Sequence, residues 1–416
     1  MAKLGGKLAQ ARPAFEAAPI RYDWPVSRRS ARALNPTFAS IPTSIFETMS
    51  GLAREHGAIN LGQGFPDAPG PEDIRAKAAE ALMSGSNQYP PMRGLMELRE
   101  AVAAHYNLHQ GLDLTAAEVV VTSGATEALA ASLLALLSPG DEVVLFEPAY
   151  DAYLALLERA GATARFVRLQ PPAWRLTEAA LEAAITPRTR VVVLNNPHNP
   201  VARMFDAEEI ALIARACVRH DLIALCDEVW EHVAFDGAVH RPLIAEPGMR
   251  ERTVKVGSAG KIFSVTGWKV GWACAAPKLI GPIMGAHQYL TFTTPPNLQT
   301  AVAWGLGKPL DWFEQMRAGY QRSRDRLATG LTQAGFKVLP GEATYFLCVD
   351  LAASGVNLDD EAFCRRAVAE HGVAAIPVSA FYPADPVRTV IRLCFAKADD
   401  TLDEGVARLA RAKRGL

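Results

Sequence analysis

Short apolar runs alternate with helical patterns along most of the chain from about residue 60. The predicted strands lie at 118–124, 141–148, 163–169, 190–197, 222–230, 253–260 and 268–275. Between them, apolar residues recur at the spacing of a helix. The predicted helices lie at 71–85, 95–111, 126–140 and 207–220. Continuous apolar strands separated by helices are typical of a largely parallel sheet covered on both faces.

The pattern changes near residue 300. A helical segment at 297–306 leads to a long helical pattern over 311–335. Beyond it, predicted strands at 336–340, 344–351 and 390–396 accompany predicted helices at 359–372 and 401–415. This mixture predicts a smaller α+β unit after the larger α/β unit.

The first 35 residues differ from the rest of the chain. They are rich in Ala and Arg and are interrupted by Pro13, Pro19 and Pro25. We therefore expect an extended or partly disordered arm over residues 1–35. We divide the rest of the chain into three parts. Residues 36–60 form an N-terminal segment that contributes to a small domain, residues 61–300 a large domain, and residues 301–416 a small C-terminal domain.

Composition narrows the class of protein. Half of the residues are hydrophobic and 21% are charged, as in an ordinary globular chain. The 43 Lys and Arg nearly balance the 44 Asp and Glu, so binding to nucleic acid is not expected. The six cysteines form no CxxC pair and read as reduced core thiols. No apolar signal-peptide core or bilayer-spanning segment is present, so we expect a cytoplasmic protein that binds no membrane.

Polar residues follow several of the predicted strands. In open α/β sheets, ligands bind beyond the carboxyl ends of the strands. Those ends carry Gly124–Thr126 at a helix start, Asn199, Asp227, and Ser258 with Lys261. Together these groups suit an anionic, nitrogen-containing aromatic cofactor that forms an imine with a lysine. Taken singly, each has an ordinary alternative: a helix cap, a turn residue, an ion pair or a solvated lysine.

Two further features bear on chemistry. Arg392 lies inside an apolar strand and therefore needs an anionic partner. A substrate carboxylate that accepts two parallel hydrogen bonds from the guanidinium would be such a partner. Asp227, Glu228, Glu231 and His232 are close in sequence, but their spacing matches no zinc signature. We therefore expect no metal ion in the site.

Six blocks in this sequence resemble the signature blocks of the class I/II aminotransferases, which are pyridoxal 5'-phosphate enzymes of fold type I. They are NLGQGFPD (60–67), NQYPPMRG (87–94), NNPHNP (195–200), DEVWEH (227–232), SAGKIFSVTGWKVGW (258–272) and VIRLCFAK (390–397). They follow the family's order, and the resemblance runs from about residue 36 to the end. It implies a large domain with a mostly parallel central sheet between helices, plus a smaller α+β domain. The likeness is greatest to the methionine, glutamine and kynurenine aminotransferases.

The resemblance also implies roles for individual residues. Lys261 would form the internal aldimine and then act as acid and base, while Asp227 would pair with the pyridinium nitrogen. Asn199 would bond the ring's 3-oxygen, and Tyr150 would stack on the ring. Residues implied to hold the phosphate are Gly124, Ala125, Thr126, Ser258, Lys269 and, from a neighbouring subunit, Tyr89. Residues implied to bind the substrate carboxylate are Arg392, Gly64 and Asn199.

Two positions depart from the family's pattern. Trp230 stands where the family usually has a tyrosine that bonds the 3-oxygen, and an indole N–H donates but does not accept. Lys269 stands where aspartate aminotransferases carry arginine. A planar guanidinium that can donate two parallel hydrogen bonds is thus replaced by a compact ammonium group. The first change is expected to alter the cofactor's protonation or the turnover.

The resemblance implies a transaminase that works by a ping-pong mechanism in a homodimer with shared sites. Phe65, Phe292, Tyr345 and Phe346 are candidate walls of the substrate pocket, with core packing as the alternative. Residues 291–296 contain no arginine, which favours an apolar, sulfur-containing or aromatic donor over a dicarboxylic one. Two other hypotheses stay open: a lyase that cleaves C–S bonds of cysteine conjugates, and a non-enzymatic regulator that binds the cofactor.

Overall fold

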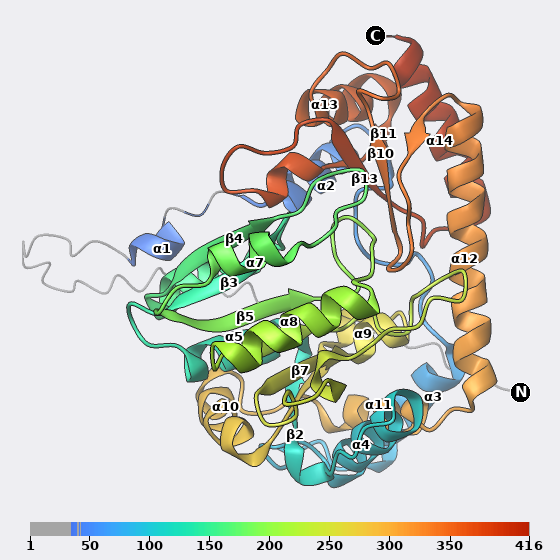
Figure 1. The fold of residues 1–416 in the computed structure, drawn as a ribbon. Coiled ribbons are helices and arrows are strands. Elements are labelled where there is room, and N and C mark those ends of the chain that lie inside the picture. Colours follow the sequence, from blue (N-terminus) through green and yellow to red (C-terminus); the bar gives the residue numbers. More distant parts are fainter. Residues whose placement is uncertain (1–34, 40, 42, 416) are drawn as a thin grey trace, which may run out of the picture. The chain divides into compact units, whose positions relative to one another are not determined.

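The computed structural model describes residues 35–39, 41 and 43–415 (Figure 1). Its contacts divide the chain into two compact units, Met1–Ser40 and Ile41–Leu416. Of the first unit, the structure describes the short helix α1 (Pro36–Ala39). Residues 1–34 of the predicted arm lie outside the described residues.

A seven-stranded sheet forms the centre of the larger unit (Figure 1). Its order is β2 (Val119–Ser123), β8 (Val270–Ala275), β7 (Thr253–Ser258), β6 (Ile223–Asp227), β5 (Thr189–Asn195), β3 (Glu142–Glu147) and β4 (Thr163–Arg168). Only β8 runs antiparallel to its neighbours. The prediction of a largely parallel sheet is confirmed.

Both faces of this sheet are covered by helices because alternate residues of each strand point to opposite sides. Val144 and Phe146 of β3 pack in the cluster under α7 (Glu178–Ala184) and α8 (Ala207–Arg219). Val143 and Leu145 of the same strand pack in a second cluster on the other face. The helices there are α5 (Gly124–Leu136), α6 (Ala152–Ala160) and α10 (Pro277–Leu290).

Three helices enclose the β2 end of the sheet. They are α3 (Glu72–Ser84), α4 (Met96–Gln110) and α11 (Pro296–Leu306), which share an apolar cluster with Trp272 of β8. Helix α4 ends at Gly111, whose φ of 65° is the left-handed conformation that glycine favours at a helix end. The predicted helices at 71–85 and 95–111 are confirmed.

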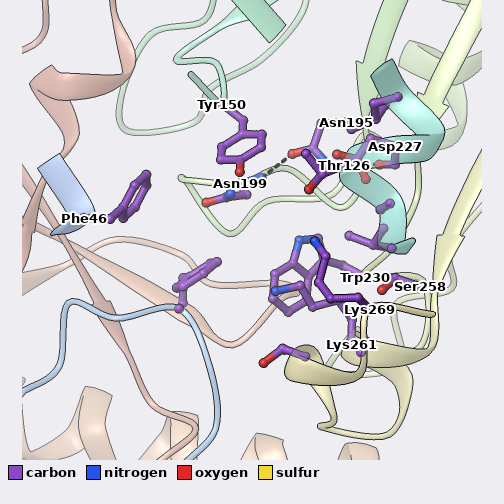
Figure 2. Close-up of a pocket in the computed structure, with 18 of the residues that line it drawn as sticks. Phe46, Thr126, Tyr150, Asn195, Asn199, Asp227, Trp230, Ser258, Lys261 and Lys269 are labelled. Carbon is purple, nitrogen blue, oxygen red and sulfur yellow. Dashed lines mark hydrogen bonds between the residues drawn. The ribbon is translucent and has the colours of Figure 1, made fainter. Parts of the chain in front are cut away.

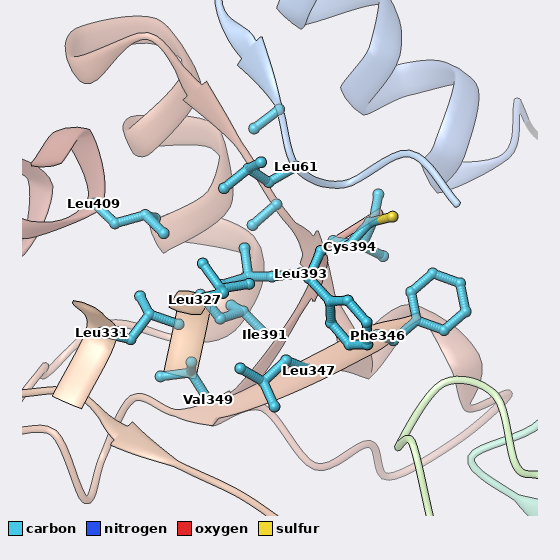
Figure 3. Packing of buried hydrophobic residues seen from close by; sticks show 14 of the residues in the cluster. Leu61, Leu327, Leu331, Phe346, Leu347, Val349, Ile391, Leu393, Cys394 and Leu409 are labelled. Carbon is cyan, nitrogen blue, oxygen red and sulfur yellow. The ribbon is translucent and has the colours of Figure 1, made fainter. Parts of the chain in front are cut away.

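A second, four-stranded antiparallel sheet follows along the chain, in the order β12 (Ile376–Pro377), β13 (Val390–Cys394), β10 (Phe346–Asp350) and β9 (Lys337–Val338). Its core contains Leu347, Val349, Ile391 and Leu393 (Figure 3). The helices beside it are α12 (Leu310–Gln333), α13 (Asp360–His371) and α14 (Asp399–Arg414). The smaller sheet and the helices predicted after residue 300 are present.

Two elements join the N-terminal part of this unit to its C-terminal part. Helix α2 (Ile45–Glu55) places Met49 and Ala53 in the core of the smaller sheet. Strand β1 (Ile59–Asn60) pairs in parallel with β11 (Val373–Ala374). Such packing is what a contribution of residues 36–60 to the small domain requires, and the exact domain boundaries stay a prediction.

Two other expectations concern the chain as a whole. All six cysteines are buried and free, as expected for reduced core thiols. Within the part of the chain that the structure describes, no helix has both the length and the apolar character needed to span a bilayer.

Candidate active site

A pocket of about 350 Å³ lies where β2, β5, β6 and β7 end (Figure 2). It gathers side chains from both sheets, because Phe346 and Arg392 reach it from β10 and β13. Thirteen residues singled out from the sequence line it: Gly64, Gly124, Ala125, Thr126, Tyr150, Asn199, Asp227, Trp230, Ser258, Lys261, Lys269, Phe346 and Arg392.

Lys261 lies on the short helix α9 (Ala259–Ile262), directly after β7. Its Nζ donates a hydrogen bond to the Tyr345 hydroxyl over 3.1 Å and lies 4.6 Å from the centre of the Trp230 ring. Burial lowers the pKa of Lys261 to about 8, because the charged ammonium loses its solvation. This amine therefore loses its proton at a lower pH than an ordinary lysine does, which suits it to act as a nucleophile.

Asp227 closes β6 and is buried. Its Oδ2 accepts a hydrogen bond of 2.7 Å from the Tyr153 hydroxyl, while Oδ1 is buried without a partner among the described residues. Burial raises the pKa of Asp227, and the bond from Tyr153 and the charge of Lys261 oppose that rise. An unpaired carboxylate oxygen at this depth suits a cationic N–H of a ligand.

The start of α5 forms a cradle beside Lys269. Gly124 has a φ of 75°, and a Cβ added there would lie 3.2 Å from Lys269 Nζ. Ala125 and Thr126 follow in the first turn, whose backbone N–H groups have no helical partners. Ser258 adds a hydroxyl at the end of β7. A helix N-terminus with an ammonium group beside it is a suitable site for a phosphate.

Arg392 is almost completely buried, with 1% of its surface exposed. It donates to Asn199 Oδ1 over 2.8 Å and to the Gly62 carbonyl over 3.1 Å. Its guanidinium lies 3.9 Å from the centre of the Phe346 ring, and no carboxylate of the described residues pairs with it. Burial lowers its pKa to about 10. A buried guanidinium without a carboxylate partner suits an anionic ligand.

Some predicted residues lie elsewhere. Tyr89 is 83% exposed and does not line the pocket of its own chain. Phe65 and Phe292 are also outside the lining, whereas Phe346 is part of it. Tyr345, predicted only as an apolar wall, instead contacts Lys261 through its hydroxyl.

Several residues at the site were missed in the sequence, and two of them, Phe46 and Tyr153, bear on how the site is built. Phe46 of α2 lines the pocket. It could not be predicted from the sequence because it lies outside all of the motifs. Tyr153, which donates a hydrogen bond to Asp227, could have been suspected from its spacing. It follows Tyr150 by three residues, so both side chains lie on one side of the turn that leads into α6.

The acidic residues that follow Asp227 converge on a cation that the chain itself supplies. Glu228 and Glu231 both bind the ammonium of Lys255, which is fully buried. His232 pairs instead with His105, at 2.7 Å between their Nε2 atoms. A metal site built from the 227–232 run therefore has no support in this geometry.

Comparison with known proteins places the chain in a family. The family model for aminotransferase class I and II matches residues 56–409. The chain belongs to the class I and II aminotransferases. A probable N-succinyldiaminopimelate aminotransferase DapC from Mycobacterium tuberculosis is 44% identical to this aminotransferase over 380 residues, covering 88% of this chain and 96% of the relative.

Other relatives of this aminotransferase carry different substrate names. The methionine aminotransferase of Escherichia coli is 42% identical over 369 residues, covering 88% of this chain and 95% of the relative. The solved structure of N-succinyldiaminopimelate aminotransferase from Mycobacterium tuberculosis superposes with a TM-score of 0.89, covering 91% of this chain and all 100% of that one. The enzyme thus has the fold type I architecture and depends on pyridoxal phosphate, like its family.

The residues present fit that cofactor. The unpartnered Oδ1 of Asp227 suits the ring nitrogen, and the Gly124 cradle leaves the space that a side chain would fill. Lys261 offers an amine of lowered pKa in the same pocket.

Proposed function

We propose that this enzyme transfers the amino group of an apolar, sulfur-containing or aromatic L-amino acid to a 2-oxo acid in two half-reactions. The proposed chemical class of the amino donor rests on one observation. The cations lining the pocket are Lys261, Lys269 and Arg392, each of which already has a part in the chemistry. The described lining therefore offers no further cation for a side-chain carboxylate of the donor.

We propose that Arg392 binds the donor's α-carboxylate with both arms of its fork. Asn199 already accepts from one of those arms, and Phe346 stacks on the guanidinium plane. These contacts hold the fork in one orientation before substrate arrives, so little entropy is lost on binding. The α-carboxylate in turn fixes where the Cα–H bond points.

Lys261 is proposed to take the proton from Cα and return it to C4′ of the cofactor. When bound, pyridoxal phosphate spreads the negative charge left on Cα over its ring. Tyr345 donates its own proton to the Gly64 carbonyl over 2.6 Å, so its oxygen is free to accept from Lys261. That bond directs the amine while leaving its lone pair available as a base.

We propose that Asp227 keeps the ring nitrogen protonated and that Tyr153 keeps the carboxylate in place. Asn199 is proposed to bond the 3-oxygen and Tyr150 to cover the ring face. Trp230 is proposed to pack beside the ring without the accepting role of a phenol. The proposed phosphate ligands are Gly124, Ala125, Thr126, Ser258 and Lys269, with Gly64 beside the substrate carboxylate.

The enzyme is further proposed to act as a homodimer with shared sites. Tyr89 is 83% exposed and packs edge-on against Phe292 at 5.6 Å between ring centres. Tyr289, which lies near the end of α10 and three residues before Phe292, is 86% exposed. Exposed aromatic residues in one region are typical of an interface, and a second copy is the proposed occupant. Molecular mass in solution, with Tyr89→Ala as a probe of cofactor affinity, tests this arrangement.

A cytoplasmic location is proposed on the chemistry of the thiols. All six cysteines are buried and unpaired, as expected of a chain that folds in a reducing compartment. Cell fractionation followed by immunodetection would check the assignment.

The test of the function is a half-reaction without an acceptor. The holoenzyme is mixed in turn with methionine, kynurenine, glutamine, N-succinyldiaminopimelate and aspartate, and its absorbance is followed. We expect methionine or kynurenine to convert the pyridoxal band to that of pyridoxamine phosphate with release of a 2-oxo acid. Conversion by aspartate or the succinylated donor alone would refute the donor class.

Two controls accompany this experiment. Lys261→Ala is expected to fold and to lose conversion, whereas Lys77→Ala, on the surface of α3, keeps it. A cysteine S-conjugate is added as a further substrate; pyruvate, ammonia and a free thiol formed from it without an acceptor would instead indicate the C–S lyase, which the relatives do not favour.

A further inference from the structure

Three histidines meet at a point that the proposed chemistry does not use. His105 and His109 lie one helical turn apart on α4, and His232 lies in the loop after β6. One ring nitrogen from each lies within 4.8 Å of the other two. Two histidines four residues apart on a helix present their rings on the same face, as many metal-binding helices do.

Hydrogen bonding satisfies this cluster only in part. His105 Nδ1 lies 3.3 Å from the Leu306 carbonyl, which only accepts, so Nδ1 carries the proton. The Nε2 of a neutral His105 is then a lone pair, and His232 Nε2, 2.7 Å away, must donate to it. His109 Nε2 is buried with no partner among the described residues. Such an orphaned nitrogen calls for a ligand.

The three imidazoles are held neutral. Burial lowers the pKa of His105 to about 3, and burial also lowers the pKa of His232 and His109. Metal binding needs an unprotonated nitrogen on each ring, so His232 would bind a metal through Nε2 in the tautomer that carries its proton on Nδ1. The carbonyl on His105 Nδ1 further fixes the tautomer that leaves Nε2 free, as backbone acceptors do for metal-binding histidines.

Phe313 packs against all three rings, and His109 is the least buried of the three histidines. Phe313 of α12 stacks on His232 at 5.0 Å and lies 5.2 Å from His105 and 4.9 Å from His109, measured between ring centres. Phe313 is buried, whereas His109 is only partly buried. The side of the cluster toward His109 is therefore the side nearest to solvent.

The neighbouring acidic cluster is a poorer candidate. Glu228, Glu231 and His240 also lie within reach of one point, but the ammonium of Lys255 bonds both carboxylates there. A cation, the Lys255 ammonium, thus already occupies the acidic cluster.

The charges around the three histidines act in both directions. The negative charge of Glu231 favours a bound cation, whereas the positive charges of Lys255 and Arg317 oppose it.

We propose that His105, His109 and His232 bind one divalent transition-metal ion of the zinc class, with water as the fourth ligand. Zinc–nitrogen bonds of about 2.0–2.1 Å in a tetrahedron place ligand nitrogens about 3.3 Å apart. The pair now at 2.7 Å opens by about 0.6 Å, and His109 closes in. Imidazole ligands select zinc, copper, nickel or cobalt over magnesium or calcium.

Cobalt(II) is the probe, because its visible bands report tetrahedral nitrogen ligation. The holoenzyme is freed of metal, titrated with Co²⁺ and dialysed, and retained metal is measured per chain. We expect one Co²⁺ per chain, displaced by Zn²⁺. His109→Ala is expected to weaken binding at least about 100-fold, since losing a ligand exceeds the loss of an outer partner.

His56→Ala, which removes an exposed histidine at the end of α2, is the matched control and is expected to keep the site. Because His109 is partly exposed, its alanine variant is expected to fold and to retain transaminase activity. Absence of a retained ion in the unmodified enzyme, or equal retention in His109→Ala, would overturn the proposal. Either outcome leaves the proposed function untouched, because that is read from the half-reaction.

Discussion

Removal of one hydroxyl group tests the proposed setting of Lys261. The change is Tyr345→Phe, which deletes the acceptor 3.1 Å from Lys261 Nζ and keeps the buried ring. A hydrogen bond to a charged group contributes about 1.5–3 kcal/mol, and one between neutral groups about 0.5–1.5 kcal/mol. The bond therefore stabilises the ammonium over the amine by about 1 kcal/mol.

The sign of the effect follows from that difference. Burial has already lowered the pKa of Lys261 to about 8, and the bond to Tyr345 favours the charged form. Its loss lowers the pKa further. At 1.36 kcal/mol per unit, 1 kcal/mol corresponds to about 0.7 unit.

The assay is the rate at which the apoprotein takes up pyridoxal phosphate, followed by absorbance across pH. Only the unprotonated amine attacks the aldehyde, so the rate rises through the pKa of Lys261. We expect the midpoint to fall by about 0.7 unit in Tyr345→Phe. Tyr320→Phe is the control, because that phenol bonds Ser264 instead of Lys261. A midpoint that stays in place or rises in Tyr345→Phe would refute the reasoning.

Three other changes probe the buried charges. Lys255→Met leaves two buried glutamates without their ammonium, so the free energy of unfolding in urea should fall by about 3–5 kcal/mol; a loss below about 1 kcal/mol would contradict this. Arg392→Lys exchanges the fork for a point charge, so the KM of the donor in steady-state kinetics should rise about 10- to 100-fold. An unchanged KM argues against carboxylate binding there. Tyr153→Phe removes the side-chain hydrogen bond that Tyr153 donates to Asp227, so the half-reaction followed by absorbance should slow about tenfold; a rate equal to that of the unmodified enzyme would mean that Asp227 needs no such support.

Much of the fold could be predicted from the local pattern of apolar and polar residues. The strand at 253–258 and the helix at 96–110 were predictable because apolar periodicity and a terminal glycine are properties of neighbouring residues. The antiparallel course of β8 between β2 and β7 was not, because strand order depends on pairing between distant segments. Short strands such as β1 and β11 carry too few residues for any periodicity.

The site divides in the same way. Lys261 and Asp227 stood out in the sequence because each follows an apolar strand within a distinctive block. The contact between Arg392 and Asn199 joins residues 193 positions apart, and only the packing of the two sheets brings them together.

The sequence by itself determined the longer helices and strands, the family resemblance and the candidate lysine, because these depend on residue type and near spacing. Tertiary structure alone decided that Tyr153 holds Asp227, that Tyr345 receives Lys261, and that Lys255 occupies the acidic cluster. Hydrogen bonds and ion pairs among buried groups form where separate segments converge. Their partners are set by distance in space, which spacing along the chain does not encode.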